Sequence, residues 1–296
     1  MIKILVLGSK GQLGSCLNDQ LRNTKYEVVY TSRGQIDVAD FNETKTKIIE
    51  IAPNIVINTA AFTAVDKAEQ EKEKSDLINN LAVKNIAEIC NYIDCWLFHI
   101  STDYVFDGKS NVAYKEDSET SPQGIYGLTK LEGEFAIQSS GCKYIIIRTA
   151  WVYSEYGNNF LKTMLRLGIE RDELNIVNDQ IGCPTYAQDI AKAIVAILPQ
   201  LNRKVESGVY HYCGDHACSW YDFAKEIFKA SEMLNASTKT SIYPLKTSEY
   251  HTLAERPMYS VLDCSKITQD FGIRPPKSFK KIESIVKLLH GKKNED

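Results

Sequence analysis

Tyr126 and Lys130 are four residues apart, so on a helix they would share one face. A lysine ammonium beside a phenol favours the phenolate and lowers the tyrosine pKa, which suits a general acid for a ketone oxygen. The chain contains 16 tyrosines, and Tyr221 and Lys225 repeat the same spacing. The spacing alone therefore does not identify a site. The sequence around each of the two tyrosine–lysine pairs must decide which pair is functional.

Continuous apolar runs, typical of buried strands, alternate with helical patterns along the first half of the chain. Strands buried on both faces and joined through helices form a parallel sheet with helices on either side. We therefore predict an α/β fold with a doubly wound, Rossmann-type parallel sheet and a smaller mixed α/β lobe. The expected strands are residues 2–7, 28–31, 55–58, 96–100, 144–148 and 208–212; the expected helices are 12–21, 40–51, 74–92, the Tyr126 helix, 159–167, 187–198, 220–230 and 279–289, with mixed turns over 238–257.

The length of 296 residues suits two lobes, because a single hydrophobic core stops growing near this size. Residues 1–150 are the expected dinucleotide-binding domain, to which the chain returns near residues 187–212. Residues 151–186 and 213–296 are the expected substrate-binding lobe. Ligands of an open parallel sheet bind at the carboxyl ends of its strands. The segments 58–61, 101–103 and 149–151 follow strands and should therefore meet in one crevice.

The loop after the first strand has the pattern GxxGxxG and leads into a helix. Glycine allows a tight turn and a close approach of phosphate, whose charge the helix N-terminus stabilises. This context predicts a dinucleotide site. Its expected contacts in the loop are Gly8, Gly11, Gln12, Leu13 and Gly14.

The end of the second strand bears on the choice of cofactor. NAD specificity usually requires an acidic residue about twenty positions after the glycine loop. Here the strand ends at Arg33 without a carboxylate, and a guanidinium matches the geometry of a 2′-phosphate. NADPH is therefore favoured, NADH stays possible, and a merely solvated Arg33 is the alternative. Asp37 and Val38 follow after a short loop and could border the adenine.

A series of ordered motifs resembles the extended short-chain dehydrogenase/reductase family, and within it the dTDP-4-dehydrorhamnose reductases. The resemblance implies NADPH-dependent reduction of the C4 ketone of dTDP-4-dehydro-L-rhamnose to dTDP-L-rhamnose, the last step of rhamnose donor synthesis. It also selects Tyr126 over Tyr221, which lacks the family context. The matching segments are the Gly8 loop and residues 58–69, 101–106, 124–134, 148–153, 157–167, 179–185 and 256–263.

The same resemblance implies a role for each matching residue. Tyr126 would protonate the developing C4 alkoxide, and Thr102 would hydrogen-bond the same oxygen. Lys130 would bind the nicotinamide ribose hydroxyls and lower the pKa of Tyr126. The other implied contacts are Ala60, Ala61 and Thr63 to the cofactor, and Asp103, Tyr104, Trp151, Asn159 and Arg256 to the substrate.

The residues after Thr102 narrow the reaction type. Related sugar-nucleotide 4,6-dehydratases carry Asp-Glu at this point, because the elimination of water needs an additional acid and base. Here the pair is Asp103 and Tyr104, so simple reduction is expected. Three other assignments have structural alternatives: Tyr104 and Trp151 could be core aromatics, Arg256 could form a surface ion pair, and the small residues of the cofactor loop could simply pack.

Composition excludes several classes of partner. The net charge of −3 offers no general field for nucleic acid or an anionic membrane. The short apolar run at the N-terminus is too short for a secretory signal or a membrane span. We expect a cytoplasmic enzyme, a monomer or weak homodimer, whose partner is a small dTDP-linked 4-keto-6-deoxy sugar.

Two sets of residues bear on whether the protein binds a metal ion. Some bacterial members of the family use glutamates to hold magnesium across a dimer, but the matching positions here carry Cys16 and Gln188, which replace a carboxylate poorly. We therefore predict no metal requirement. The eight cysteines are expected to be reduced thiols. A zinc site in the cluster formed by His211, Cys213, His216 and Cys218 stays an alternative, although its spacing matches no common motif.

Two rival functions stay open. One is a reductase of another 4-keto-6-deoxy sugar nucleotide, including a UDP-linked one, because the sequence does not fix the base or the sugar stereochemistry. The other is a non-catalytic, NADP-binding regulator that resembles the regulatory subunit of methionine adenosyltransferase. The intact set of Thr102, Tyr126 and Lys130 favours an enzyme over this second rival.

Overall fold

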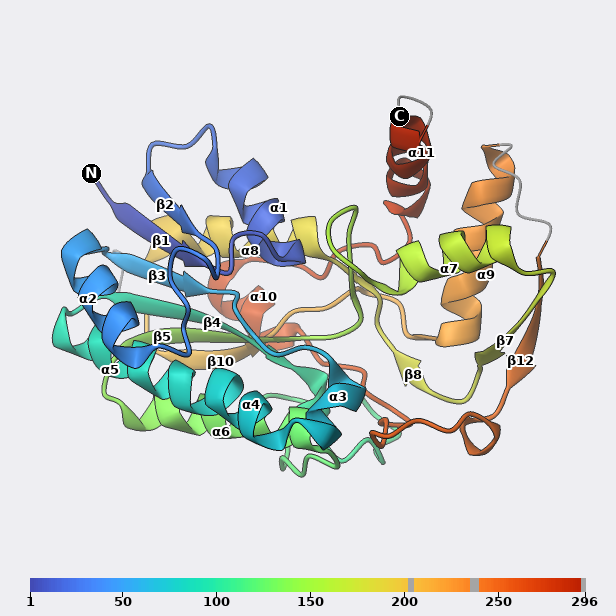
Figure 1. The fold of residues 1–296 in the computed structure, drawn as a ribbon, viewed down its shortest axis with the longest axis horizontal. Helices are drawn as coiled ribbons and strands as arrows, with labels where there is room; N and C mark the ends of the chain where they lie inside the picture. The colour runs from blue at the N-terminus through green and yellow to red at the C-terminus, as the bar shows by residue number, and fades with distance from the viewer. Residues whose placement is uncertain (202–204, 235–239, 294–296) are drawn as a thin grey trace.

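The computed structural model describes residues 1–201, 205–234 and 240–293 (Figure 1). At its centre is a six-stranded sheet in the order β10-β5-β4-β3-β1-β2, in which every pair is parallel. The prediction of a parallel Rossmann-type sheet is confirmed. The strands are β1 (Lys3–Leu7), β2 (Glu27–Thr31), β3 (Ile55–Asn58), β4 (Trp96–Thr102), β5 (Lys143–Thr149) and β10 (Gly208–His211).

Each strand packs against helices on both faces of the sheet, as its continuous apolar sequence requires. In β1, Ile4 and Val6 join one core cluster, whereas Leu5 and Leu7 join the other. Figure 1 shows the two helical layers above and below the sheet. The first cluster includes residues of α1 (Gln12–Leu21), α8 (Ala187–Ile197) and α10 (Ser265–Phe271); the second includes residues of α2 (Phe41–Ile51), α5 (Ala82–Tyr92) and α6 (Ile125–Ser139).

The segment between β3 and β4 differs from the single helix expected over residues 74–92. It consists of α3 (Val65–Gln70), α4 (Lys72–Asp76), a π-helical turn (Leu77–Leu81) and α5. Asn79 lies buried in the π-helical turn, and its side chain exchanges hydrogen bonds with the backbone N–H and C=O of Phe62, at 2.8 and 3.1 Å. The turn thus fixes the loop that follows β3.

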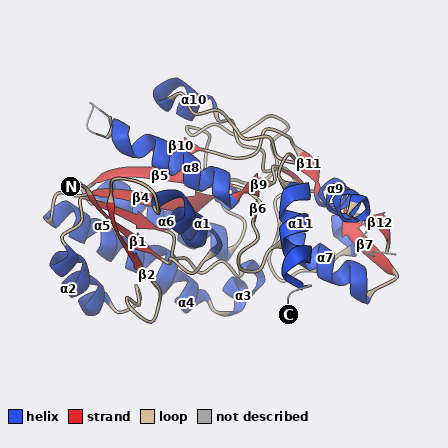
Figure 2. Ribbon diagram, turned by 90° about the horizontal axis from the view of Figure 1, so that it is seen from above, coloured by secondary structure: helices blue, strands red, loops and turns tan. Residues whose placement is uncertain are grey.

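A second group of elements lies beyond the carboxyl ends of the central strands (Figures 1 and 2). Its helices share a core cluster of their own. The expectation of mixed turns over residues 238–257 is wrong for 241–245, which form a strand parallel to β7. The group contains β6 (Val152–Tyr153), β7 (Glu173–Val177), β8 (Ile181–Gly182), β9 (Thr185–Tyr186), β11 (Cys218–Ser219), β12 (Ser241–Leu245), α7 (Phe160–Glu170), α9 (Trp220–Met233) and α11 (Ile282–Lys293).

A helix cap and the strand register fix the positions of polar residues at the start of a helix and at the ends of the strands. Asp40 caps α2 by accepting a hydrogen bond from the Glu43 N–H at 2.9 Å, as expected from its position. The parallel register aligns Asn58 at the end of β3 with His99, and Thr102 at the end of β4 with Thr149. Within the described residues, no helix is long and apolar enough to cross a membrane.

Candidate active site

The glycine loop between β1 and α1 is tightly packed. Gly8 has a φ of +77°, and a Cβ there would lie 2.7 Å from the backbone nitrogen of Ala60. A Cβ on Gly14 would lie 2.4 Å from the Gly8 carbonyl oxygen. Gly11 precedes α1 without a side-chain cap, so the loop presents uncapped N–H groups at the helix N-terminus. These are the features that a phosphate needs for close approach.

A cavity of about 420 Å³ lies over this loop and gathers most of the expected cofactor contacts. Lys10 and Lys74 also line it, and the sequence analysis missed both, although Lys10 is part of the loop itself. The expected residues in its lining are Gly8, Gly11, Arg33, Asp37, Val38, Ala60 and Ala61.

The other six expected cofactor contacts, Tyr126 and Lys130 among them, lie outside the lining of this cavity. Gly14 packs under the loop, Leu13 belongs to the core, and Thr63 is exposed. Gln12 turns towards the second group of elements, where its side-chain oxygen accepts hydrogen bonds from Ser154 Oγ and Asn159 Nδ2, both at 2.9 Å.

Arg33 and Asp37 form an ion pair at the edge of the same cavity. The Arg33 Nε lies 3.0 Å from the Asp37 carboxylate, while 74% of the Arg33 side chain is exposed. The guanidinium is therefore anchored through Nε at a solvent-facing position. This geometry suits an anion that arrives from solvent.

Thr102, Asp103 and Tyr126 come together at the carboxyl end of β4. The Thr102 hydroxyl donates to Asp103 Oδ1 at 3.0 Å and accepts from the backbone N–H of Tyr104 at 3.2 Å. Tyr126 lies in the first turn of α6, and its ring meets that of Tyr104 edge-on at 5.5 Å. Glu69 caps α6 by accepting from the Ile125 N–H at 2.8 Å.

The expected lowering of the Tyr126 pKa by Lys130 stays a prediction. Burial raises the pKa of Tyr126, while a hydrogen bond with Thr102 opposes that shift. Burial lowers the pKa of Lys130 to about 8, against the attraction of Glu134. Lys130 Nζ instead lies 2.6 Å from the Ile100 carbonyl oxygen and 2.9 Å from His99 Nε2. His99 is a site residue that the sequence analysis missed.

Asp103 is 2% exposed, and burial raises its pKa to about 6, although the hydrogen bond from Thr102 and the nearby Ser260 oppose the shift. Tyr104 is affected by the same environment: burial raises its pKa to about 12, while Arg256 lowers it through charge and a hydrogen bond. Tyr104 therefore connects Tyr126 on one side with Arg256 on the other.

The expected substrate residues lie on the side of the second group of elements. Trp151 has a φ of +46° and stacks on Trp220, with ring centroids 3.4 Å apart. Arg256 pairs with Asp66 at 2.8 Å, the ion pair considered as its alternative. Arg256 and Trp220 also line a cavity of about 410 Å³ with apolar residues of α7 and β7, Gln180 and Tyr250.

Asn159 has a structural role that its sequence position did not reveal. Its side-chain oxygen accepts from the Lys162 N–H at 3.1 Å and so caps α7. Its amide nitrogen donates to Gln12 and to the Ser154 carbonyl oxygen. The side chain thus connects α7 to the glycine loop side of the molecule.

Two other motifs take no part in this site. His211 Nδ1 lies 3.1 Å from the Tyr114 carbonyl oxygen, and Cys213 Sγ lies 3.7 Å from Cys264 Sγ. In the parts of the chain that the structure describes, no group of three or more His, Cys, Asp or Glu side chains is arranged to hold a metal ion. Lys225 pairs with Asp222 and lies over the Tyr221 ring on an exposed helix face.

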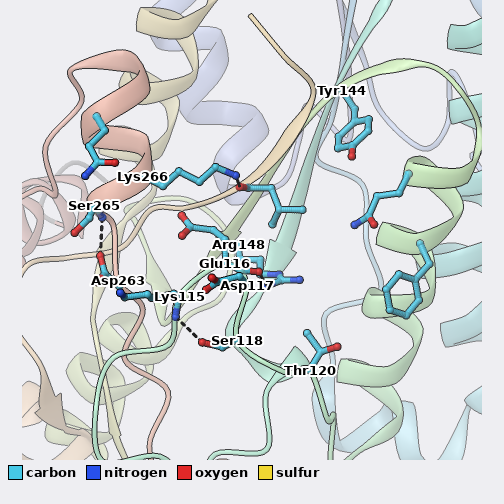
Figure 3. A pocket seen from close by; sticks show the side chains of 14 residues that line it. Lys115, Glu116, Asp117, Ser118, Thr120, Tyr144, Arg148, Asp263, Ser265 and Lys266 are labelled. Atoms are coloured by element: carbon cyan, nitrogen blue, oxygen red, sulfur yellow. Dashed lines mark hydrogen bonds between the residues drawn. The ribbon is translucent and has the colours of Figure 1, made fainter.

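A cavity of about 820 Å³ lies away from Tyr126, beside β10 and between α6 and α10 (Figure 3). Two of its charged side chains, Glu116 and Lys266, form hydrogen bonds with the backbone of β10. Glu116 accepts from the backbone N–H of His211 at 2.9 Å, and Lys266 Nζ donates to the Val209 carbonyl oxygen at 2.8 Å. These bonds cover the outer edge of the sheet, where an unpaired strand would be a template for aggregation.

Comparison with known proteins places the chain in a family. Residues 2–290 match the family described as RmlD substrate binding domain. A dTDP-4-dehydrorhamnose reductase of Sinorhizobium fredii is 38% identical over 98% of this chain and 99% of its own length. The crystal structure of the dTDP-4-dehydrorhamnose reductase of Clostridium acetobutylicum superposes with a TM-score of 0.92, at 37% identity over 98% of this chain and all of that one.

A second solved structure adds a bound cofactor. The dTDP-4-dehydrorhamnose reductase of Bacillus anthracis, in complex with NADP, superposes with a TM-score of 0.90, at 34% identity over 97% of this chain and 100% of its own. Sequence and structure thus agree over nearly the whole length of the chain. The chain belongs to the RmlD substrate binding domain family.

Proposed function

We propose that this protein reduces the C4 ketone of dTDP-4-dehydro-L-rhamnose with NADPH, giving dTDP-L-rhamnose in the last step of rhamnose donor synthesis. The observation that carries the proposal is that contacts around Tyr126 and its helix lead to two different cavities. On one side, Lys130 and its partners lead back to the glycine loop cavity. On the other side, Tyr104 connects Tyr126 to Arg256 and the second cavity.

The glycine loop cavity is the proposed cofactor site. Gly8, Gly11 and Ala60 allow the backbone to approach a pyrophosphate, and Lys10 and Lys74 add positive charge to the same wall. Arg33 is the proposed contact for a 2′-phosphate, which makes NADPH the preferred cofactor over NADH. The NADP complex of the Bacillus anthracis relative supports this choice. When bound, NADPH supplies the hydride that the C4 carbon receives.

Tyr126 is the proposed proton donor to the C4 alkoxide. Its raised pKa keeps the phenol protonated at neutral pH, as a general acid must be before the reaction. Thr102 is the proposed second donor to the same oxygen, and its single hydroxyl proton would turn from Asp103 to the substrate when the sugar binds. Donors fixed where negative charge develops stabilise the transition state without reorganising during the reaction. The buried Asp103 holds the Thr102 hydroxyl at 3.0 Å.

The second cavity is the proposed site for the nucleotide of the substrate. Arg256 offers a guanidinium for the diphosphate, and Trp220 offers a ring face for the base. Trp151, held against Trp220, would wall the sugar pocket. We accordingly propose residues 1–150 and 187–212 as the cofactor lobe, and 151–186 and 213–296 as the substrate lobe, of a cytoplasmic enzyme, with α10 of the second range packed on the central sheet.

A pair of tyrosine variants tests the proposal. Tyr126→Phe should retain NADPH affinity and lower kcat by about 10²–10⁴-fold, the usual contribution of a general acid. Tyr221→Phe is the matched control, since it sits in the same tyrosine–lysine spacing on an exposed helix face. Its kcat should stay at the wild-type value. Equal activities of the two variants would refute the role of Tyr126, and a wild type without sugar-dependent NADPH oxidation would favour a regulator.

A further inference from the structure

A chain of buried hydrogen bonds runs from the proposed cofactor loop to Lys130. The Ala60 N–H donates to Asn58 Oδ1 at 3.1 Å, and Asn58 Nδ2 lies 3.2 Å from His99 Nδ1. His99 Nε2 lies 2.9 Å from Lys130 Nζ, which also donates to the Ile100 carbonyl oxygen at 2.6 Å. The side-chain members of the chain are no more than 2% exposed. Water is therefore a poor substitute for any of these contacts.

The direction of these bonds follows from the first donor. The backbone N–H of Ala60 can only donate, so the oxygen of the Asn58 amide must face it. The amide NH₂ then faces His99 Nδ1 and can only donate, so Nδ1 must carry a lone pair. Burial holds the pKa of His99 well below its usual range, so the ring is neutral. A neutral ring with a bare Nδ1 carries its proton on Nε2.

This tautomer decides which form of Lys130 fits. The Nε2–H of His99 is a donor aimed at Lys130 Nζ. An uncharged amine accepts that hydrogen bond with its lone pair and still donates to the Ile100 carbonyl oxygen. An ammonium has no lone pair, so two donors would face each other across 2.9 Å. Burial lowers the pKa of Lys130 to about 8, which acts in the same direction.

The neighbouring charges do not reverse this preference. Glu134, one turn further along α6, attracts the proton of Lys130 and raises its pKa against the larger effect of burial. Both carboxylate oxygens of Glu134 accept hydrogen bonds from Arg148 of β5, at 2.7 to 3.2 Å. His99 of β4 is a further titratable group in contact with Lys130, and Tyr126 lies one turn earlier on the same helix.

We propose that Asn58 and His99 are positioning residues that, in mildly alkaline solution, hold Lys130 as an uncharged amine until the cofactor binds. The proposal rests on the proposed function at one point. When NADPH binds, its ribose hydroxyls beside Lys130 would accept hydrogen bonds from an ammonium. The proton that Lys130 gains comes from solvent. The charge then lowers the pKa of Tyr126, which burial raises in the cofactor-free protein. Activation of the acid thus waits for the cofactor.

The tautomer of His99 is tested without cofactor or substrate. Long-range ¹H–¹⁵N spectra of protein labelled at its five histidines distinguish the two neutral tautomers, and His99→Gln identifies the His99 signals. We expect the Nε2–H tautomer from pH 8.5 to pH 9.5, where Lys130 is uncharged. An Nδ1–H tautomer, or an imidazolium in this range, overturns the proposal. The outcome is independent of the reaction that the protein catalyses.

The charge of Lys130 is tested by proton uptake on NADPH binding, measured calorimetrically at pH 9 in two buffers of different ionisation enthalpy. A lysine pKa that moves from about 8 towards its ordinary 10.5 takes up about 0.9 proton at this pH. In Asn58→Asp, a carboxylate accepts from Nδ1–H, which turns Nε2 into an acceptor for an ammonium. Lys130 is then charged before binding, and uptake should fall below about 0.3 proton.

Two further variants complete the test. His99→Gln can turn its side-chain oxygen towards Lys130, so it should lose uptake as Asn58→Asp does. His211→Gln is the control, because His211 is also buried and neutral but contacts Tyr114 instead of Lys130. Negligible uptake in the wild type, or equal uptake in all variants, overturns the proposal. Normal uptake without reduction of the sugar would refute the proposed function and leave this inference standing.

Discussion

The buried ion pair between Glu134 and Arg148 makes a quantitative prediction about stability. The two side chains are 0% and 5% exposed, and three hydrogen bonds join them at 2.7, 3.0 and 3.2 Å. Glu134→Gln keeps the shape but leaves the Arg148 charge buried without compensation. Loss of one partner of such a pair costs about 3–5 kcal/mol of unfolding free energy. For a chain of this size, that corresponds to a fall in Tm of roughly 6–10 °C.

Denaturant unfolding followed by circular dichroism measures this loss. Glu88→Gln is the matched control on α5, because Glu88 pairs with Lys84 at 4.0 Å on an exposed face and should change stability by less than about 0.5 kcal/mol. Adding Arg148→Met to Glu134→Gln removes the orphaned charge and should recover part of the loss. A loss below about 1 kcal/mol in Glu134→Gln, or no recovery in the double variant, would refute the reasoning.

Three further predictions concern the site. Gly14→Ala should raise the NADPH Kd at least about tenfold in fluorescence titration, because its Cβ would lie 2.4 Å from the Gly8 carbonyl oxygen; an unchanged Kd would contradict the packing argument. Gly182→Ala should raise the sugar-nucleotide KM and leave the NADPH Kd unchanged, since its Cβ would lie 2.4 Å from the Trp151 indole; steady-state kinetics with a binding titration separates these effects. Burial raises the pKa of Asp103 from 3.8 to about 6, so wild-type stability falls as pH rises through this interval. Asp103→Asn should therefore be more stable than wild type by up to about 3 kcal/mol above pH 7, with a gain that shrinks towards pH 4; a gain independent of pH in denaturant titrations would contradict this.

Much of the sheet was predictable because its strands are continuous apolar runs between turn signals. The missing elements lack such a signal. The strand β12 is largely exposed and contains Pro244, and its parallel partner β7 lies far away in the sequence. The π-helical turn (Leu77–Leu81) interrupts a helix whose apolar periodicity continues through it, so nothing in the pattern marks the interruption.

Of the candidate site, the sequence located the strand ends but not the partners of the reactive groups. The rule that ligands bind at carboxyl ends of strands predicted that residues 58–61, 101–103 and 149–151 lie together, and the register aligns Thr102 with Thr149. The position of Lys130 depends on His99, whose only sequence signal is one polar residue inside an apolar strand. The bond between Gln12 and Asn159 joins residues 147 positions apart, and no local pattern encodes it.

The central claim concerns the reaction itself. The most direct test is to incubate the purified protein with NADPH and dTDP-4-dehydro-L-rhamnose, follow the absorbance of NADPH, and identify the product by NMR. We predict one dTDP-L-rhamnose formed for each NADPH oxidised, with the loss of turnover in Tyr126→Phe as the control. No oxidation of NADPH, or a product whose C4 is still a ketone, would contradict the account.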